Sequence, residues 1–455
     1  MKTLLEKSQF GKKFTWGVAS SSYQIEGACT VDGKSSSIWD VFSHSSGKVK
    51  TGENGDEANN FYELFPEDHK LMSSLNIQNH RLSVSWSRIL PDGYSINQAG
   101  IDYYLRVFEN CLENGITPWV TLYHWDLPQS IQKNGGWCKR SILASFEVFV
   151  ETCAKAFGHL VKHWMIINEP WVIAHLGHLT GAHAPGLKGL QNYLPAIHHL
   201  ALAQAMGGKI VKGLLPSAKV GTTFSAAWID PYRPGHSGDE AAAHNYDTLL
   251  NRLFIEPLLG LGYPDDGPAF LNKLKRFKKN GDDKALVHDF DFIGIQLYTR
   301  EKVRHSHWRR PLKLKVVTAS ERNVERTEMN WEIAPEAVYK ILHRYHSYGK
   351  IKEIMITENG AAFSDRKVNG TFDDSRRITF LQEYLTQALR AKEEGVPLTG
   401  YFVWTFTDNF EWAEGYRPRF GLVHVDRKTL ERTPKKSALW YKNFLNGSDV
   451  IKAVP

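Results

Sequence analysis

Two segments of the chain decide its fold, and the first reads KEIMITENG from Lys352 to Gly360. A short apolar run, Ile354 to Ile356, is followed abruptly by a threonine, the carboxylate of Glu358, an amide and a glycine. Short apolar runs bounded by turn residues are typical of buried strands, and glycine readily lets a chain turn. The segment therefore predicts a buried strand that delivers Glu358 to its end, where Gly360 turns the chain away.

The second segment has the same construction and reads HWMIINEP from His163 to Pro170. Its apolar run ends at Asn168 and Glu169, and the strand should stop there because Pro170 cannot donate to a sheet. A glutamate after an apolar run is usually a strand end in water. Two carboxylates facing one cleft, by contrast, are what cleavage of a glycosidic bond requires. Both interpretations remain open from these two segments alone.

Strand-like and helical segments alternate along the whole chain. The expected strands lie near 14–19, 76–86, 117–123, 163–167, 219–224, 289–298, 354–358 and 400–404, and the expected helices at 61–74, 97–114, 141–157, 194–214, 241–259, 334–348, 373–394 and 436–444. Such alternation is typical of a parallel sheet with crossover helices. Eight units predict a single α/β catalytic domain over residues 1–455, a (β/α)₈ TIM barrel with elaborated βα loops. We expect long loops at 28–60 and 300–327, the second of them at the active site.

Polar and aromatic side chains gather at the carboxyl ends of the expected strands, where TIM barrels carry their reacting groups. These residues are Arg81, His124, Asn168, Glu169, Tyr298, Glu358 and Trp404. Arg81 lies inside a strand and needs a buried anion, for which Glu358 is a candidate. His124 is either a structural donor or a donor to a ligand hydroxyl. Gln24, after the first strand, is either a pocket amide or a loop residue bonded to backbone.

A further candidate segment, residues 408–416, follows the eighth strand. It places Glu411 between Phe410 and Trp412, where exposed aromatic rings would be costly unless they line something. A carboxylate beside an indole suits a sugar, because the oxygens accept hydroxyl hydrogens and the ring covers a C–H face. The alternative is a packing loop.

Five motifs in chain order resemble glycoside hydrolase family 1, the β-glucosidase and β-galactosidase group, from about Phe14 to Tyr441. They are Phe14 to Ala19 with Tyr23 to Gly27, Thr121 to Pro128, Asn168-Glu169-Pro170, Thr357 to Gly360, and Asp408 to Trp412. The resemblance implies a retaining β-glycosidase, with β-glucosidase as the expected activity on terminal non-reducing β-D-glycosyl residues. It implies a covalent glycosyl-enzyme, no metal and no organic cofactor.

The resemblance also implies a role for each matching residue. Glu169 would be the acid/base and Glu358 the nucleophile, with Tyr298 and Arg81 orienting Glu358. The hydroxyls of the glycone, which is the sugar on the non-reducing side of the bond, would be held by Gln24, His124, Asn168, Glu411 and Trp412. The glycone ring would lie above Trp404. Trp331 would stack on the leaving group, with Trp171 nearby, and Tyr298 would also border the substrate.

Two departures and three rival activities qualify this interpretation. Gln296 stands where the family usually has asparagine, and we expect the longer amide to shift the leaving-group subsite; Ser35-Ser36 replaces a more usual Gly-Pro with little expected effect. A 6-phospho-β-glycosidase would need phosphate-binding groups where Glu411 lies. A thioglucosidase would lack Glu169, and a non-catalytic sugar-binding relative would lack one of the two glutamates.

Composition indicates a globular protein that acts on small molecules. The net charge is +7 at pH 7, and the basic residues are scattered, so we expect no nucleic-acid partner. No apolar run is long enough to span a membrane. Four cysteines in no metal-binding pattern (Cys29, Cys111, Cys138 and Cys153) and an N-terminus without an apolar leader favour the cytoplasm. The expected partner is a small-molecule β-glycoside or short β-linked oligosaccharide, and an oligomer is possible.

Overall fold

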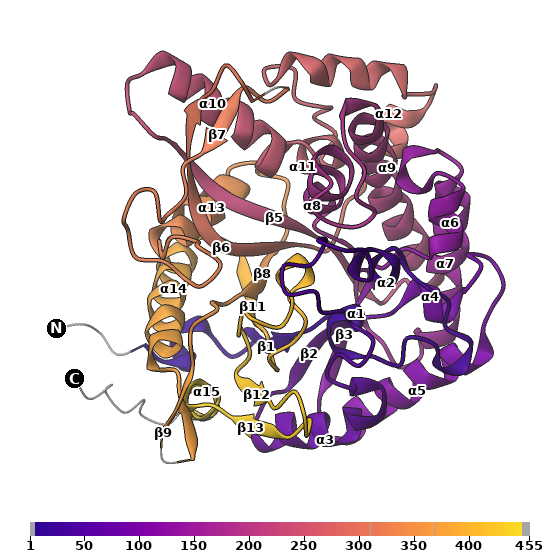
Figure 1. Cartoon of the computed structure of the whole chain (residues 1–455), viewed down its shortest axis with the longest axis vertical. Coiled ribbons are helices and arrows are strands. Elements are labelled where there is room, and N and C mark those ends of the chain that lie inside the picture. Colours follow the sequence, from indigo (N-terminus) through magenta and orange to yellow (C-terminus); the bar gives the residue numbers. More distant parts are fainter. Residues whose placement is uncertain (1–4, 310, 369, 448–455) are drawn as a thin grey trace.

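Eight parallel strands form one closed barrel at the centre of the molecule (Figure 1). The computed structural model describes residues 5–309, 311–368 and 370–447. The barrel strands are β1 (Thr15–Ala19), β2 (Asn79–Ser83), β3 (Thr117–Tyr123), β4 (His163–Asn168), β5 (Lys219–Pro231), β6 (Phe292–His305), β8 (Ile354–Asn359) and β11 (Leu398–Trp404). Neighbours pair in chain order, and β11 pairs with β1 to close the ring. The predicted (β/α)₈ barrel is confirmed.

Amphipathic helices surround the barrel, and Figure 1 shows α5 and α7 on one side of it and α14 on the opposite side. The main helices are α3 (Phe61–Ser74), α5 (Gln98–Glu113), α7 (Ile142–Phe157), α9 (Leu190–Leu214), α10 (Ser237–Asp247), α13 (Glu336–His346), α14 (Ser375–Glu393) and α15 (Lys436–Asn446). On α5 the buried residues Tyr104, Phe108 and Cys111 recur every three or four positions, which places them on one face. That spacing explains why the helix packs against the barrel.

Shorter elements fill the loops. The short helices are α1 (Ser22–Ile25), α2 (Ile38–Ser43), α4 (Trp86–Ile89), α6 (Gln129–Lys133), α8 (Pro170–Ala174), α11 (Ile255–Leu258) and α12 (Asp282–Ala285). The short strands are β7 (Leu314–Val316), β9 (Arg366–Val368), β10 (Thr371–Asp373), β12 (Val423–Val425) and β13 (Arg432–Pro434). The 3₁₀ helices are η1 (Lys7–Phe10), η2 (Val31–Gly33), η3 (Gly136–Cys138), η6 (Ala269–Arg276) and η7 (Trp412–Glu414), and the π-helical segments are η4 (His175–Thr180) and η5 (Thr248–Arg252).

Three expectations for the loops and helices were wrong in part. The segment 300–327 is not irregular throughout, because β6 continues to His305 and then pairs with β7. The segment 28–60 contains α2 and a short turn. The helix expected at 241–259 divides into α10, a wide turn and α11, since a run of helical spacing in sequence does not reveal where the backbone departs from a regular helix.

The extension of β5 and β6 is the largest departure from a simple barrel. The two strands stay paired beyond the barrel rim, through Ile229 opposite Glu301 and on to Pro231 opposite Val303. A register shift between Ala226 and Trp228 bends the pair where it leaves the barrel. The extension forms a wall that rises above the carboxyl ends of the other strands.

Two separate hydrophobic clusters hold the fold together. The larger lies between the barrel and its helices, and the smaller contains Trp119, Phe292 and Phe402 in the barrel interior. The smaller cluster also contains Trp404 and has Tyr298 packed against it. The upper layer of the barrel core therefore also forms the floor of the space above the carboxyl ends of the strands.

The ends of β4 and β8 follow the sequence closely. β4 ends at Asn168, and Pro170 is the first residue of α8, where its missing N–H has no intrahelical partner to lose. A Cβ on Gly360 would lie 1.8 Å from the carbonyl oxygen of Trp404. Gly360 is therefore required because two strand ends approach closely, rather than for an unusual φ angle.

Candidate active site

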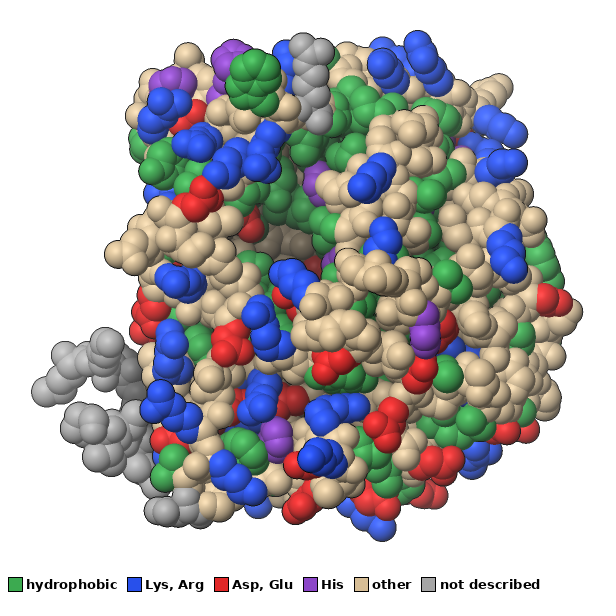
Figure 2. Space-filling model, in the orientation of Figure 1, with side chains coloured by type: hydrophobic (Ala, Val, Ile, Leu, Met, Phe, Trp, Pro, Cys, Tyr) green, Lys and Arg blue, Asp and Glu red, His purple; other side chains and the backbone are tan. Residues whose placement is uncertain are grey.

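A cavity of about 390 Å³ opens above the carboxyl ends of the barrel strands. Figure 2 shows a hollow in this face of the molecule. Eight of the eleven predicted site residues line the cavity: His124, Glu169, Tyr298, Trp331, Glu358, Trp404, Glu411 and Trp412. Arg81, Asn168 and Gln24 are fully buried behind that lining. The volume suits a small organic ligand.

The two predicted catalytic glutamates lie in this one cavity, and Glu358 is held on both oxygens. The phenol of Tyr298 donates to its Oε2 at 2.6 Å, and the guanidinium of Arg81 donates to its Oε1. The side chain of Arg81 is fully buried and that of Glu358 nearly so. Arg81 thus has the anion that its burial requires, and the two donors together hold the carboxylate of Glu358 in place.

Glu169 has the opposite environment. Glu169 is the N-cap residue of α8 and has a left-handed backbone conformation (φ 48°). Its backbone N–H donates to the carbonyl oxygen of Thr223 at 3.1 Å. Burial, followed by the negative charge of Glu358, raises the pKa of its carboxyl well above the usual range. A hydrogen bond from Ser225 and the charge of Arg81 act against this shift without cancelling it. The cavity therefore holds two carboxyls in contrasting environments, one held by two donors and one whose pKa is raised.

Asn168 connects the two glutamates from behind the lining. Its Oδ1 accepts hydrogen bonds from Arg81, from Thr223 at 3.0 Å and from Gln296 at 2.9 Å. Its Nδ2 then faces Nε2 of His124 at 3.0 Å. Because Nε2 accepts that hydrogen, the neutral ring carries its own hydrogen on Nδ1.

His124 is available to a ligand as a neutral donor. Burial and then the charge of Arg81 lower its pKa well below the ordinary value, so the ring stays uncharged. Its Nδ1 is buried and has no hydrogen-bond partner among the described residues. A ring that lines a cavity with an unsatisfied donor suits a ligand hydroxyl.

The expectation for Gln296 was wrong. Its side chain is fully buried and does not line the cavity. Besides Asn168, its Nε2 lies 3.2 Å from the hydroxyl of Thr357. The buried amide therefore contacts Asn168 and Thr357 and does not reach a leaving group directly.

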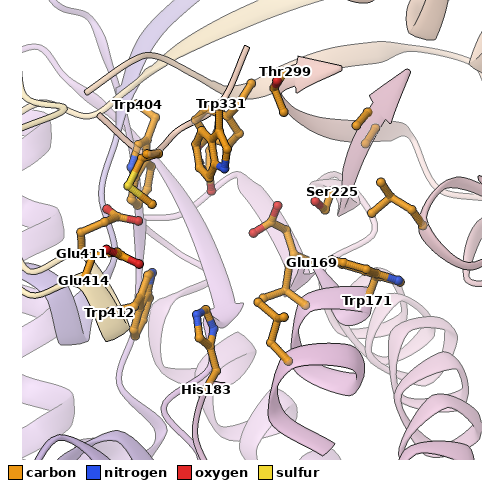
Figure 3. A pocket seen from close by; sticks show the side chains of 18 of the residues that line it. Glu169, Trp171, His183, Ser225, Thr299, Trp331, Trp404, Glu411, Trp412 and Glu414 are labelled. Atoms are coloured by element: carbon orange, nitrogen blue, oxygen red, sulfur yellow. Dashed lines mark hydrogen bonds between the residues drawn. The ribbon is translucent and has the colours of Figure 1, made fainter. Parts of the chain in front are cut away.

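The opposite side of the cavity carries the predicted sugar clamp. Figure 3 shows Trp404, Glu411 and Trp412 together on one side, facing Trp171 across the cavity. Burial, followed by the charges of Glu358 and Glu414, raises the pKa of Glu411 to about 8. The segment 408–416 is thus a cavity wall, although part of it also packs.

Gln24 supports this clamp from behind. Its Nε2 donates to the carbonyl oxygen of Phe410 at 2.8 Å and lies 3.4 Å from Oε2 of Glu411. Ser21 donates to its Oε1 at 2.6 Å. The amide of Gln24 therefore has protein partners on both its oxygen and its nitrogen. It holds Glu411 in place, and its predicted contact with substrate remains a prediction.

Sequence reasoning missed several residues of the lining. These include Trp125, His183, Ser225, Thr299, Glu301, Met329, Glu414 and Phe420. Ser225 follows the expected end of the fifth strand directly, and Thr299 that of the sixth. Continuing both strands by a few residues would have found them, whereas His183 and Phe420 come from loops that carry no periodic signal.

One group of side chains away from the cavity has the residue types of a metal site. His69, His80 and Cys111 are buried, and their donor atoms lie within 4.8 Å of one another. Nε2 of His69 lies 3.2 Å from Sγ of Cys111, and its Nδ1 lies 2.8 Å from the side-chain oxygen of Asn110. Nε2 of His80 lies 2.8 Å from the hydroxyl of Ser20, so all three groups are already engaged in hydrogen bonds. The cluster does not border the cavity.

In the described part of the chain, no helix is long and apolar enough to cross a bilayer.

Known proteins that resemble this chain point to one family. The sequence model of glycosyl hydrolase family 1 matches residues 6–449. Beta-glucosidase A of Thermotoga maritima is 39% identical, covering 97% of this chain and 98% of its own, and the 1,4-beta-D-glucan glucohydrolase of Thermotoga neapolitana is 39% identical, covering 97% and 99%. A solved Thermotoga maritima family 1 glycoside hydrolase, complexed with a cyclophellitol analogue transition state mimic, has a TM-score of 0.91 at 40% identity and covers 96% of this chain and 98% of that one. This chain therefore belongs to glycosyl hydrolase family 1.

Proposed function

We propose that this protein is a retaining β-glucosidase that releases terminal non-reducing β-D-glucosyl residues. The observation that carries the proposal is the pair of glutamates in one cavity, Glu358 held by two hydrogen-bond donors and Glu169 with a raised pKa. Retaining glycosidases need one carboxylate and one carboxylic acid in this relation. The names of the Thermotoga relatives support glucose as the sugar.

The first step in this proposal forms a glycosyl-enzyme. Glu358 attacks the anomeric carbon, while Glu169 gives its proton to the departing oxygen. Arg81 and Tyr298 keep the attacking carboxylate oriented. The two carboxyls should lie about 5–5.5 Å apart, the spacing for direct attack.

The second step reverses the role of Glu169. Once Glu358 is an ester, its negative charge no longer raises the pKa of Glu169. Glu169 then accepts a proton from water as the water attacks the anomeric carbon from the face that the leaving group occupied, and the bond from that carbon to Glu358 breaks, which restores the carboxylate. The β configuration is retained because the anomeric carbon is inverted twice.

Substrate recognition follows from the two walls of the cavity. Glu411, Trp412 and His124 would hold the sugar above Trp404, and Trp331 would stack on the leaving group. The substrate is a small β-glycoside or short β-linked oligosaccharide, and a solved Thermotoga maritima relative has deoxynojirimycin bound. The whole chain would act as one catalytic domain. A reducing, cytoplasmic location is proposed from the cysteine content alone.

The test uses 4-nitrophenyl β-D-glucoside and the variant Glu358→Ala. We expect turnover to be lost, and azide to restore it with an α-glucosyl azide product, because azide would replace the missing nucleophile in a single inversion. Wild-type activity in Glu358→Ala would refute the nucleophile assignment. A β-azide product from Glu358→Ala would refute the two-step mechanism.

A further inference from the structure

A carboxylate outside the catalytic pair, that of Glu301, lines the same cavity. Glu301 lies on the extended part of β6, opposite Ile229 of β5. It is three residues beyond Tyr298, or about 10 Å along a strand. No step of the proposed reaction uses it.

The position of Glu301 is on the leaving-group side. Glu301 and Tyr246 line the cavity together, and burial, followed by the charge of Glu301, raises the pKa of Tyr246. The ring of Tyr246 packs edge-on against Trp171, with centroids 6.2 Å apart. Figure 3 shows Trp171, Ser225 and Thr299 across the cavity from Trp404, Glu411 and Trp412. Glu301 therefore borders the part of a ligand that departs.

Glu301 has no hydrogen bond or ion pair within residues 5–309, 311–368 and 370–447. Arg322, whose charge acts on Glu301, and the adjacent Arg300 are already engaged elsewhere. Arg300 and Arg322 each contact Glu332 at 2.6 Å, on different oxygens. The carboxylate of Glu301 thus faces the cavity without a direct counter-ion.

A half-buried, unpaired carboxylate is unfavourable unless something in the cavity pairs with it. Burial raises the pKa of Glu301 to about 7, with Arg322 opposing that shift and Glu332 adding to it. An ammonium group in the cavity would replace the missing counter-ion and form a charge-assisted hydrogen bond. An anionic group would be repelled.

We propose that Glu301 selects the leaving group and favours β-glucosides whose leaving group carries a positively charged amine, such as an amino sugar, over matched anionic ones. This inference rests on the proposed β-glucosidase function. It concerns selectivity only, since Glu301 touches neither reacting glutamate.

The test compares three β-D-glucosides with matched leaving groups: 4-(aminomethyl)phenyl, 4-(hydroxymethyl)phenyl and 4-carboxyphenyl. At pH 8, kcat/KM is measured for the wild type, for Glu301→Gln and for Glu301→Asp. The ratio of kcat/KM for the aminomethyl substrate to kcat/KM for the carboxy substrate should fall about tenfold in Glu301→Gln. Glu301→Asp should keep most of that ratio, and the hydroxymethyl substrate should change little.

A matched control separates a local effect from bulk charge. Glu383 is an exposed carboxylate on the outer helix α14, so Glu383→Gln makes the same change in net charge far from the cavity. It should leave the ratio unchanged. A second charge-removing variant, Glu301→Ser, covers the case in which Glu301→Gln does not fold.

Binding gives a readout that does not depend on turnover. The inhibition constant of the uncleaved 4-(aminomethyl)phenyl 1-thio-β-D-glucoside should rise about tenfold in Glu301→Gln. An unchanged ratio in both charge-removing variants, or an equal change in Glu383→Gln, would overturn the inference. If the wild type cleaved none of the three glucosides, the proposed function itself would fail.

Discussion

Tyr298 donates a hydrogen bond to Oε2 of Glu358 at 2.6 Å, and this contact leaves the other oxygen to Arg81. Each oxygen of the carboxylate thus accepts a hydrogen bond from a different donor. A hydrogen bond to a charged group contributes about 1.5–3 kcal/mol. Part of the reactivity of Glu358 should therefore depend on a phenol that never touches the bond being broken.

Tyr298→Phe should lower kcat/KM for 4-nitrophenyl β-D-glucoside by about 10- to 100-fold, because the nucleophile loses one of its two positioning donors. Burst kinetics should show slower formation of the glycosyl-enzyme. Tyr339→Phe is the matched control, since it removes a tyrosine–glutamate hydrogen bond to Glu394 on the exposed surface. Equal activity in Tyr298→Phe and wild type would mean that the contact does not matter for attack.

The loss of activity in Glu169→Gln should depend on whether the leaving group needs a proton in order to depart. With an unactivated alkyl β-glucoside, kcat/KM should fall about 10²- to 10⁴-fold. With 2,4-dinitrophenyl β-glucoside, whose leaving group departs without a proton, formation of the glycosyl-enzyme should stay near the wild-type rate. A similar loss on both substrates would contradict the acid role.

The pH profile gives an independent check on Glu169. The acid must be protonated, so kcat/KM falls as pH rises through its pKa, which burial and the charge of Glu358 raise well above the ordinary value. The alkaline limb should therefore lie well above the usual range of a carboxyl, and it should disappear in Glu169→Gln. An alkaline limb that survives in Glu169→Gln would assign it to another group.

Discrimination against 6-phosphorylated glucosides should depend on pH through Glu411. Burial and neighbouring carboxylates raise its pKa to about 8, so its negative charge becomes complete only above that pH. The ratio of kcat/KM for 4-nitrophenyl β-glucoside to that for its 6-phosphate should therefore increase as pH rises from 7 to 9. In Glu411→Gln the ratio should be smaller and no longer change with pH. A preference for the phosphate would overturn the clamp argument.

A buried ion cluster around Lys435 should make a large contribution to the free energy of unfolding. Lys435 is fully buried and donates to Asp365 and, at 2.7 Å, to Asp408. Lys435→Met leaves both carboxylates without this cation, and it should destabilise the protein by about 3–5 kcal/mol at pH 7. Chemical denaturation measures this. Lys436→Met, which removes a half-exposed contact to Asp373, should change stability by less than about 1 kcal/mol.

The same cluster predicts how stability responds to acid. Burial disfavours the charge on Asp408, but Lys435, a hydrogen bond from His424 and the charge of Arg377 outweigh it and lower its pKa to about 2. The stabilisation is present above the unfolded value of about 3.9 and is lost as pH falls through 2. Lys435→Met should lose less stability over that range, and an identical acid dependence would contradict this origin.

The barrel and its strand ends could be predicted because apolar runs that stop at a polar residue leave a strong local signal. Glu358 and Glu169 were found in this way, and both do lie in one cavity. Gln296 was misread, because direction depends on packing: the amide turns toward Asn168 in the core. Glu301 was missed, since nothing in its neighbours shows that β6 continues past the barrel rim.

The ends of β5 and β6 form one wall of the cavity from paired strands instead of a free loop, and in the proposed function this wall would meet the leaving group. On this wall the inward positions are Ser225, Ala226 and Ala227 of β5 and Thr299 and Glu301 of β6, which line the cavity. Exchanging only the inward positions would retune which aglycones are accepted, while the register of the barrel beneath keeps the two glutamates fixed. Mutant libraries confined to these inward positions should yield new specificities with little loss of folded protein, and natural variants could have diverged by the same route.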